Sequence, residues 1–142
     1  MADIKNLFHI DAPVEKVYAA ISTIEGLRNW WTQQTNGGEK AGDTIQFRFG
    51  NYGGPDMLIK ELKPNKLVAW NCIDGMQDWQ GTALSFKLDI NEGKTRVRFE
   101  HANWKTSDDF FAACSFTWGR YMESLRLYCE TGKGKPFGAK DS

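Results

Sequence analysis

Apolar and polar residues alternate along much of this chain, and the alternation predicts six β-strands. The first covers residues 4–11, and the others are TIQFRF, DMLIKELK, KLVAWNCI, QGTALSFKLDI and TRVRFEHANW, between residues 44 and 104. The turns NYGGP, KPNK and NEGK are short enough for an antiparallel meander. Residues 35–43, TNGGEKAGD, have the composition of a loop, so we predict no strand there.

Three other segments have the 3.6-residue period of a helix. Pro13 suits a first helical turn, and the apolar positions that follow predict a short helix over residues 14–21. A second short helix is predicted for residues 24–31. The third runs from about Ser107, its N-cap, to about Thr131, and is about 35 Å long at 1.5 Å per residue. Its apolar stripe consists of Phe111, Cys114, Trp118, Tyr121, Met122, Leu125 and Cys129.

The order of these elements predicts an α+β fold, in which a curved six-stranded antiparallel sheet grips the long C-terminal helix. We expect a single domain over residues 1–142, in which about residues 133–142 form a flexible tail. One helix covers the face of such a sheet only in part, so a cavity between helix and sheet is expected. Trp30 and Trp31 are predicted to close its mouth.

The charge and cysteine content narrow the possible functions. The 18 basic and 18 acidic residues give a formal net charge of zero, which argues against nucleic-acid binding. No segment has the pattern of a signal peptide or of a membrane span, so we expect no membrane insertion. Cys72, Cys114 and Cys129 are odd in number and lack CxxC spacing, which disfavours a disulfide framework and a zinc site. We expect a cytoplasmic protein without a metal or cofactor.

Five sequence pieces, in this order, resemble one known family. They are IDAPVEKVYAAIS, the WW pair, NGGEKAGD before a strand that ends in FRFG, KPNKLVAWNCID, and TWGRYMESLRLYCETGKGKPF. The arrangement is similar to the activator of heat-shock protein 90 ATPase homologues, in the START-like (SRPBCC), birch-pollen-allergen-like (Bet v 1-like) superfamily. It covers nearly the whole chain. The family usually has glycine before the tryptophan of the last helix, whereas here Thr117 precedes Trp118 and Gly119 follows it.

This resemblance implies a helix-grip fold with a hydrophobic pocket. Relatives include lipid carriers, hormone receptors, polyketide cyclases and co-chaperone domains, so the fold alone does not fix the function. The sequence also lacks motifs such as GxSxG, HExxH and GxxxxGK[ST]. We therefore predict non-catalytic binding of a small hydrophobic molecule, lipid-like or polyketide-like, between the long helix and the sheet.

Strand alternation and the helical stripe select the residues of this candidate site. His101 is the one polar member, and it would orient the ligand. The predicted ligand-binding residues are Trp31, Phe47, Trp70, Phe86, Phe99, His101 and Trp118. The other interpretation is that the aromatic residues pack against one another as core and that His101 is hydrogen-bonded to the backbone.

Two other functions remain as alternatives. One is a cofactor-independent enzyme, similar to a cyclase or hydrolase, with His101 as its general base. The other is a co-chaperone that activates heat-shock protein 90, as the family name suggests. The eukaryotic co-chaperones carry a further N-terminal domain, which we do not expect in 142 residues.

Overall fold

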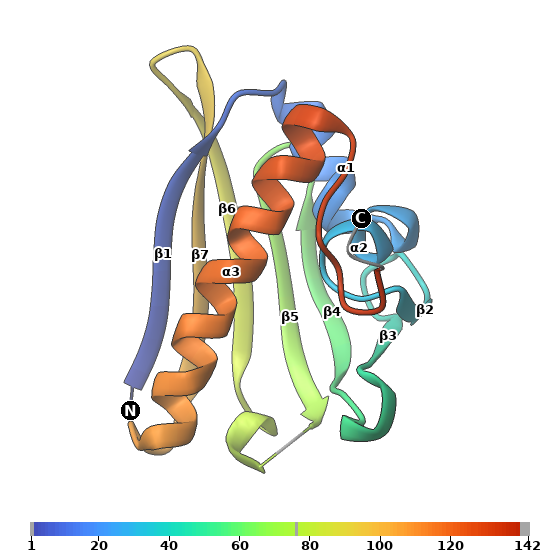
Figure 1. Cartoon of the computed structure of the whole chain (residues 1–142), viewed down its shortest axis with the longest axis vertical. Coiled ribbons are helices and arrows are strands. Elements are labelled where there is room, and N and C mark those ends of the chain that lie inside the picture. The colour runs from blue at the N-terminus through green and yellow to red at the C-terminus, as the bar shows by residue number, and fades with distance from the viewer. Residues whose placement is uncertain (1, 76, 140–142) are drawn as a thin grey trace.

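The computed structural model describes residues 2–75 and 77–139, which form an antiparallel sheet curled around a long helix (Figure 1). The strand order is β1-β7-β6-β5-β4-β3-β2, so the first strand lies beside the last and the others form a meander. The predicted α+β architecture with a long C-terminal helix is confirmed. The elements in chain order are β1 (Ala2–Ile10), α1 (Val14–Ser22), α2 (Ile24–Trp30), β2 (Gln34–Gly37), β3 (Thr44–Arg48), the 3-10 turn η1 (Gly50–Tyr52), β4 (Asp56–Lys63), β5 (Leu67–Asp74), the 3-10 turn η2 (Gln77–Trp79), β6 (Ala83–Asn91), β7 (Lys94–Trp104) and α3 (Asp109–Thr131).

The sheet has seven strands in the described residues, and the predicted number of six is wrong. The missed strand is β2, which begins at Gln34 and overlaps the segment taken for a loop. It pairs with β3, with Thr35 opposite Phe47. The buried Thr35 hydroxyl donates to the Thr32 carbonyl at 2.7 Å. Backbone pairing and this buried threonine hold the strand, and neither produces an alternation of apolar residues.

Helix α3 begins one residue later than the predicted cap implies. Its N-cap is Asp108 and not Ser107: the Asp108 carboxylate accepts a hydrogen bond from the Phe111 backbone N–H at 3.2 Å. A carboxylate there also interacts favourably with the helix dipole. The predicted end at Thr131 is confirmed, and Gly132 follows in the left-handed conformation with φ 84°.

The concave face of the sheet and one side of α3 form the core. Helix α3 lies across this face, while α1 and α2 lie beside its C-terminal half (Figure 1). The inward-pointing strand residues include Phe47, Trp70, Phe86 and Phe99, all at most 1% exposed. The predicted inner faces of these strands are therefore confirmed. The buried residues of α3 are Trp118, Met122, Ser124, Leu125 and Cys129.

After α3 the chain folds back along the helix (Figure 1). The Phe137 N–H donates to the Trp31 carbonyl at 2.8 Å, and the Gln33 N–H donates to the Phe137 carbonyl at 3.1 Å. These bonds attach the segment to the end of α2. Flexibility of residues 133–142 stays a prediction, and residues 140–142 lie outside the described part of the chain. No helix among the described residues is long and apolar enough to cross a membrane.

Candidate functional site

The predicted site residues come together, but most of them pack as core. Trp31 is central: its ring centroid lies 4.2 Å from Phe47 and 4.9 Å from Trp118, and it stacks on Trp70 at 6.3 Å. Phe99 approaches Trp118 to 4.6 Å. These side chains fill the space between the sheet and the middle of α3, where the cavity was expected.

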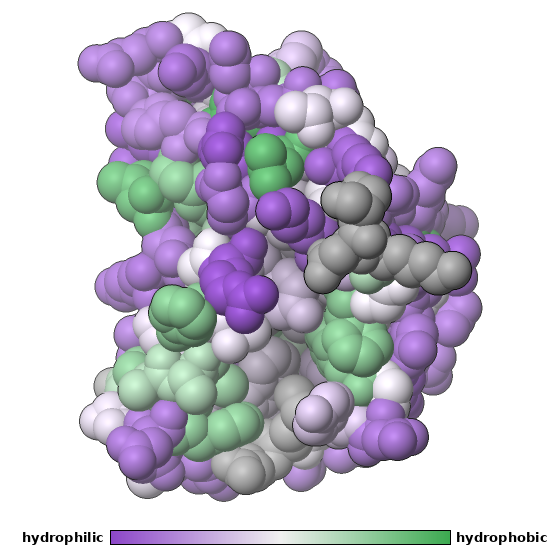
Figure 2. Space-filling view, viewed as in Figure 1, coloured by the Kyte–Doolittle hydropathy of each residue, from purple (hydrophilic) through white to green (hydrophobic). Residues whose placement is uncertain are grey.

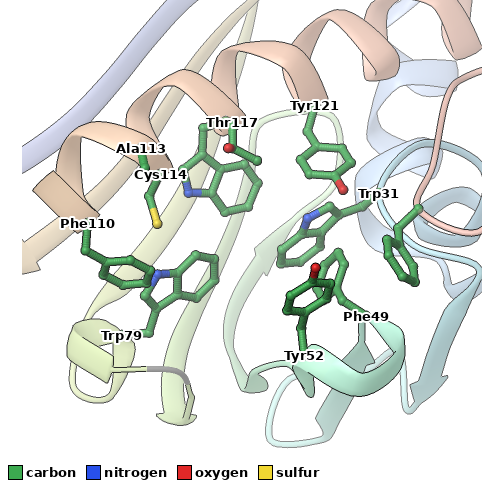
Figure 3. Close-up of a pocket in the computed structure, with 11 residues that line it drawn as sticks. Trp31, Phe49, Tyr52, Trp79, Phe110, Ala113, Cys114, Thr117 and Tyr121 are labelled. Carbon is green, nitrogen blue, oxygen red and sulfur yellow. The ribbon is translucent and has the colours of Figure 1, made fainter.

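A cavity of about 410 Å³ lies instead at one end of this core, between the first half of α3 and the turns η1 and η2 (Figure 3). Of the predicted residues, Trp31 and Trp118 line it, whereas Phe47, Trp70, Phe86, Phe99 and His101 are not among its lining residues. The eleven lining residues are Trp31, Phe49, Tyr52, Trp79, Phe110, Ala113, Cys114, Thr117, Trp118, Tyr121 and Phe137.

The two adjacent tryptophans have different positions. Trp31 lines the cavity and is only 2% exposed. Trp30 is fully buried, and its Nε1–H donates to the Ala20 carbonyl at 2.8 Å. The Ser124 hydroxyl donates to the Trp30 carbonyl at 2.7 Å. Trp30 thus joins α2 to α1 and α3 and does not close the cavity.

The sequence interpretation missed most of the lining residues. On α3 they follow the spacing Phe110, Cys114, Thr117, Tyr121, a row that shares Cys114 and Tyr121 with the predicted apolar stripe and adds Phe110 and Thr117. That spacing was the available signal, because Thr117 interrupts an otherwise apolar row. Tyr52 is 82% exposed in a turn, so no periodicity selected it.

The cavity offers a weakly polar and uncharged surface. None of its eleven described lining residues carries a formal charge at neutral pH. Burial raises the pKa of the Cys114 thiol and of the Tyr121 hydroxyl, so both keep their protons near neutral pH. On the face of Figure 2, hydrophobic side chains gather over the first half of α3, beside this opening. Such a surface suits an apolar molecule with few polar atoms.

His101 does not line the cavity, but its hydrogen bonds fix residues that do. It is fully buried, and its Nδ1 accepts from the Trp118 Nε1–H at 3.0 Å. Its Nε2 must then carry the proton, and it donates to the Thr82 hydroxyl oxygen at 2.7 Å. That hydroxyl donates to the Trp79 carbonyl at 2.5 Å.

This chain of bonds fixes the two facing tryptophans. Trp79 and Trp118 stack with ring centroids 5.8 Å apart and an angle of 20° between their planes. Burial lowers the pKa of His101 to about 3, so the ring is neutral at neutral pH. Both ring nitrogens are already bonded within the protein. His101 therefore positions the cavity walls. The sequence predicted that it would contact the ligand directly, but in this geometry it does not.

Comparison with protein families matches residues 11–130 to the family described as Activator of Hsp90 ATPase homolog 1-like protein. The match spans most of the chain. The chain belongs to this family. The resemblance inferred from the sequence pieces is therefore confirmed. The comparison with curated proteins found no significant match.

Solved structures of similar proteins support the same fold. The chain is 41% identical to the protein of the Aha1 dimer from Colwellia psychrerythraea, with a TM-score of 0.86 and coverage of 94% of this chain and 100% of that one. A protein from Staphylococcus saprophyticus is 21% identical, with a TM-score of 0.79 and coverage of 95% and 97%. CalU16 from Micromonospora echinospora is 17% identical, with a TM-score of 0.77 and coverage of 94% and 76%. The last two comparisons concern the fold alone.

Proposed function

We propose that this protein binds a small, uncharged, hydrophobic molecule in the cavity between α3 and the turns η1 and η2, without catalysing a reaction. The observation that carries the proposal is the cavity itself, with its volume of about 410 Å³ and its eleven uncharged lining residues. Ligand cavities of small molecules have volumes of roughly 300–1,000 Å³ and mostly apolar linings. Lipid-like and polyketide-like molecules remain the candidate classes, in a cytoplasmic setting and without membrane insertion or nucleic-acid binding.

The position of His101 favours binding over catalysis. The alternative enzyme would use His101 as its base, and both ring nitrogens of that residue are engaged with Trp118 and Thr82. The titratable groups that do line the cavity are the Cys114 thiol and the hydroxyls of Tyr52 and Tyr121. With the pKa values of Cys114 and Tyr121 raised by burial, neither group is prepared to act as a base.

Two neighbouring alanines on α3 provide a direct test. Ala113 lines the cavity, and Ala112 is an exposed residue outside its lining. Fluorescence titration with the neutral probe N-phenyl-1-naphthylamine should show saturable binding to the wild-type protein. Ala113→Phe should weaken this binding about tenfold or more because the ring occupies the cavity, whereas Ala112→Phe should leave it unchanged. Equal binding by both variants contradicts the proposed site. Native mass spectrometry of the protein from its own cells would then identify the natural ligand.

A second candidate is activation of a heat-shock protein 90 chaperone. It is favoured by the family and by the 41% identity to the Colwellia psychrerythraea Aha1 protein over nearly the whole chain. Such a role would use the surface of the protein, where Phe116 on α3 is 71% exposed. The test is the ATPase rate of the chaperone from the same organism with and without this protein. An increase that Phe116→Ser abolishes supports this role, and an unchanged rate contradicts it.

A further inference from the structure

One buried polar group in the cavity wall lacks a partner. Trp79 lines the cavity and is 5% exposed. Its Nε1–H has no hydrogen-bond acceptor among the described residues, the side chain of Gln77 being left aside. A buried donor without an acceptor is destabilising, and folded proteins contain few of them. Within a binding cavity, such a donor can be satisfied by an acceptor that the ligand brings.

The thiol of Cys114 lies beside this indole nitrogen (Figure 3). The two groups interact, since Trp79 partly opposes the rise that burial causes in the pKa of Cys114. This interaction is at most a weak hydrogen bond, because the Trp79 N–H has no partner that meets the usual distance and angle limits. A thiol sulfur is also a weak acceptor. An oxygen atom placed in the cavity would be a better partner for the Trp79 N–H.

Trp104 provides the internal comparison. Its Nε1 is also buried without a partner among the described residues, but Trp104 is fully buried and is not among the residues that line the cavity. Burial in this aromatic core therefore accounts for an unpartnered indole by itself. The two tryptophans differ in that the Trp79 side chain lines the cavity and the Trp104 side chain does not, and the consequence of this difference can be measured.

We propose that the Trp79 Nε1–H donates a hydrogen bond to an uncharged carbonyl oxygen of the bound molecule. The proposal rests on the proposed function and adds the chemical class of its ligand: a flat, apolar ketone, ester or related carbonyl compound. The stacked indole rings of Trp79 and Trp118 provide an aromatic surface against which a planar ring system can pack. A carboxylate is disfavoured, because none of the eleven described lining residues would compensate its charge.

The test compares 2-acetylnaphthalene with 2-ethylnaphthalene, which share the ring system and differ in the carbonyl group. Their dissociation constants are measured with the full chain, and the ratio of the two defines the ketone selectivity. Trp79→Phe should lower the ketone selectivity roughly fivefold relative to wild type, as expected for one neutral hydrogen bond. Trp104→Phe, which removes an equivalent indole outside the cavity lining, should leave it unchanged.

A second pair of variants tests the same bond without altering an indole. Cys114→Ser places a good acceptor beside Trp79, so the N–H is satisfied internally and the ketone selectivity should fall. Cys114→Ala removes the same thiol from the cavity wall without supplying an acceptor, so it should change the affinities for both naphthalenes alike and should not lower the ketone selectivity. This pair remains decisive if Trp79→Phe fails to fold.

The possible outcomes separate the two proposals. Ketone selectivity that falls in Trp79→Phe or Cys114→Ser, and is retained in their controls, supports the inference. If both ligands bind but neither variant lowers the selectivity, the inference is overturned while the proposed function stands. If neither naphthalene binds the wild-type protein, the inference and the proposed function fail together.

Discussion

His101 and Trp118 are joined by a buried hydrogen bond in which the histidine Nδ1 accepts from the indole Nε1–H at 3.0 Å. The same histidine reaches Thr82 through its other nitrogen, and Thr82 reaches the Trp79 carbonyl. One buried imidazole therefore connects β7 with both stacked walls of the cavity. His101 acts by fixing the shape of the site. Its contribution can therefore be measured as a change in the free energy of unfolding when it is replaced.

Replacing His101 by leucine should destabilise the fold strongly. The change leaves the buried Trp118 N–H without an acceptor, which costs about 1–3 kcal/mol. It also removes the bond that the Thr82 hydroxyl accepts, while the bond that this hydroxyl donates to the Trp79 carbonyl remains. We expect a loss of about 3 kcal/mol in the free energy of unfolding, measured by urea denaturation. His9→Leu, at a half-buried position of β1, should cost less than about 1 kcal/mol. Similar losses in the two variants would contradict the structural role of His101.

The depressed pKa of His101 predicts a specific loss of stability in mild acid. Burial lowers the pKa of His101 from 6.5 to about 3 in the folded state. Below pH 6.5 the unfolded chain binds a proton that the folded chain does not, so stability falls as the pH falls. The slope approaches about 1.4 kcal/mol per pH unit roughly one unit below pH 6.5 and vanishes roughly one unit above it.

Urea denaturation between pH 7.5 and 4.5 measures this slope. His101→Gln retains an acceptor for Trp118 and has no titrating ring, so its stability should depend less on pH than that of the wild type over this window. The window stays above the range in which Asp89, with a pKa lowered to about 2 chiefly by its hydrogen bond to Arg96, begins to contribute. Parallel pH profiles of wild type and variant would contradict a neutral buried His101.

An aspartate at Phe99 should unfold the domain. Phe99 is 1% exposed and its ring lies between Phe86 and Trp118, so the carboxylate would be buried without a partner. We expect a loss of more than about 4 kcal/mol, seen as loss of the cooperative urea transition. Leu7→Asp is the matched control, because Leu7 is 63% exposed on β1 and should tolerate the charge. Full stability of the Phe99 variant would mean that β7 presents its other face to the core.

Alternation and helical period were sufficient to predict most of the fold. The burial of Phe86, Phe99 and His101 follows directly from the period of two along β6 and β7. The strand β2 did not follow, because its pairing with β3 depends on backbone hydrogen bonds and on one buried threonine, Thr35. The alternation of apolar and polar residues does not predict a strand that forms only because it pairs with a neighbouring strand.

The location of the cavity was harder to predict for a related reason. The pattern showed which side chains point inward, but it did not show how completely they fill the space. Trp31 packs against Phe47, Trp70 and Trp118, so the expected volume under α3 is occupied. The cavity lies instead where η1, η2 and Phe137 meet the helix, and contacts between segments this far apart in sequence have no periodic signal.

Mapping a bound probe by NMR tests the central claim most directly. Titration of the ¹⁵N-labelled protein with N-phenyl-1-naphthylamine should shift the indole signals of Trp79 and Trp118 and the amide signals of Tyr52 and Thr117 in a saturable manner, because these residues line the cavity. Signals of exposed Leu7 should remain in place. Saturable shifts confined to the outer face of the sheet, with no shift at the four cavity residues, would contradict the proposed binding site.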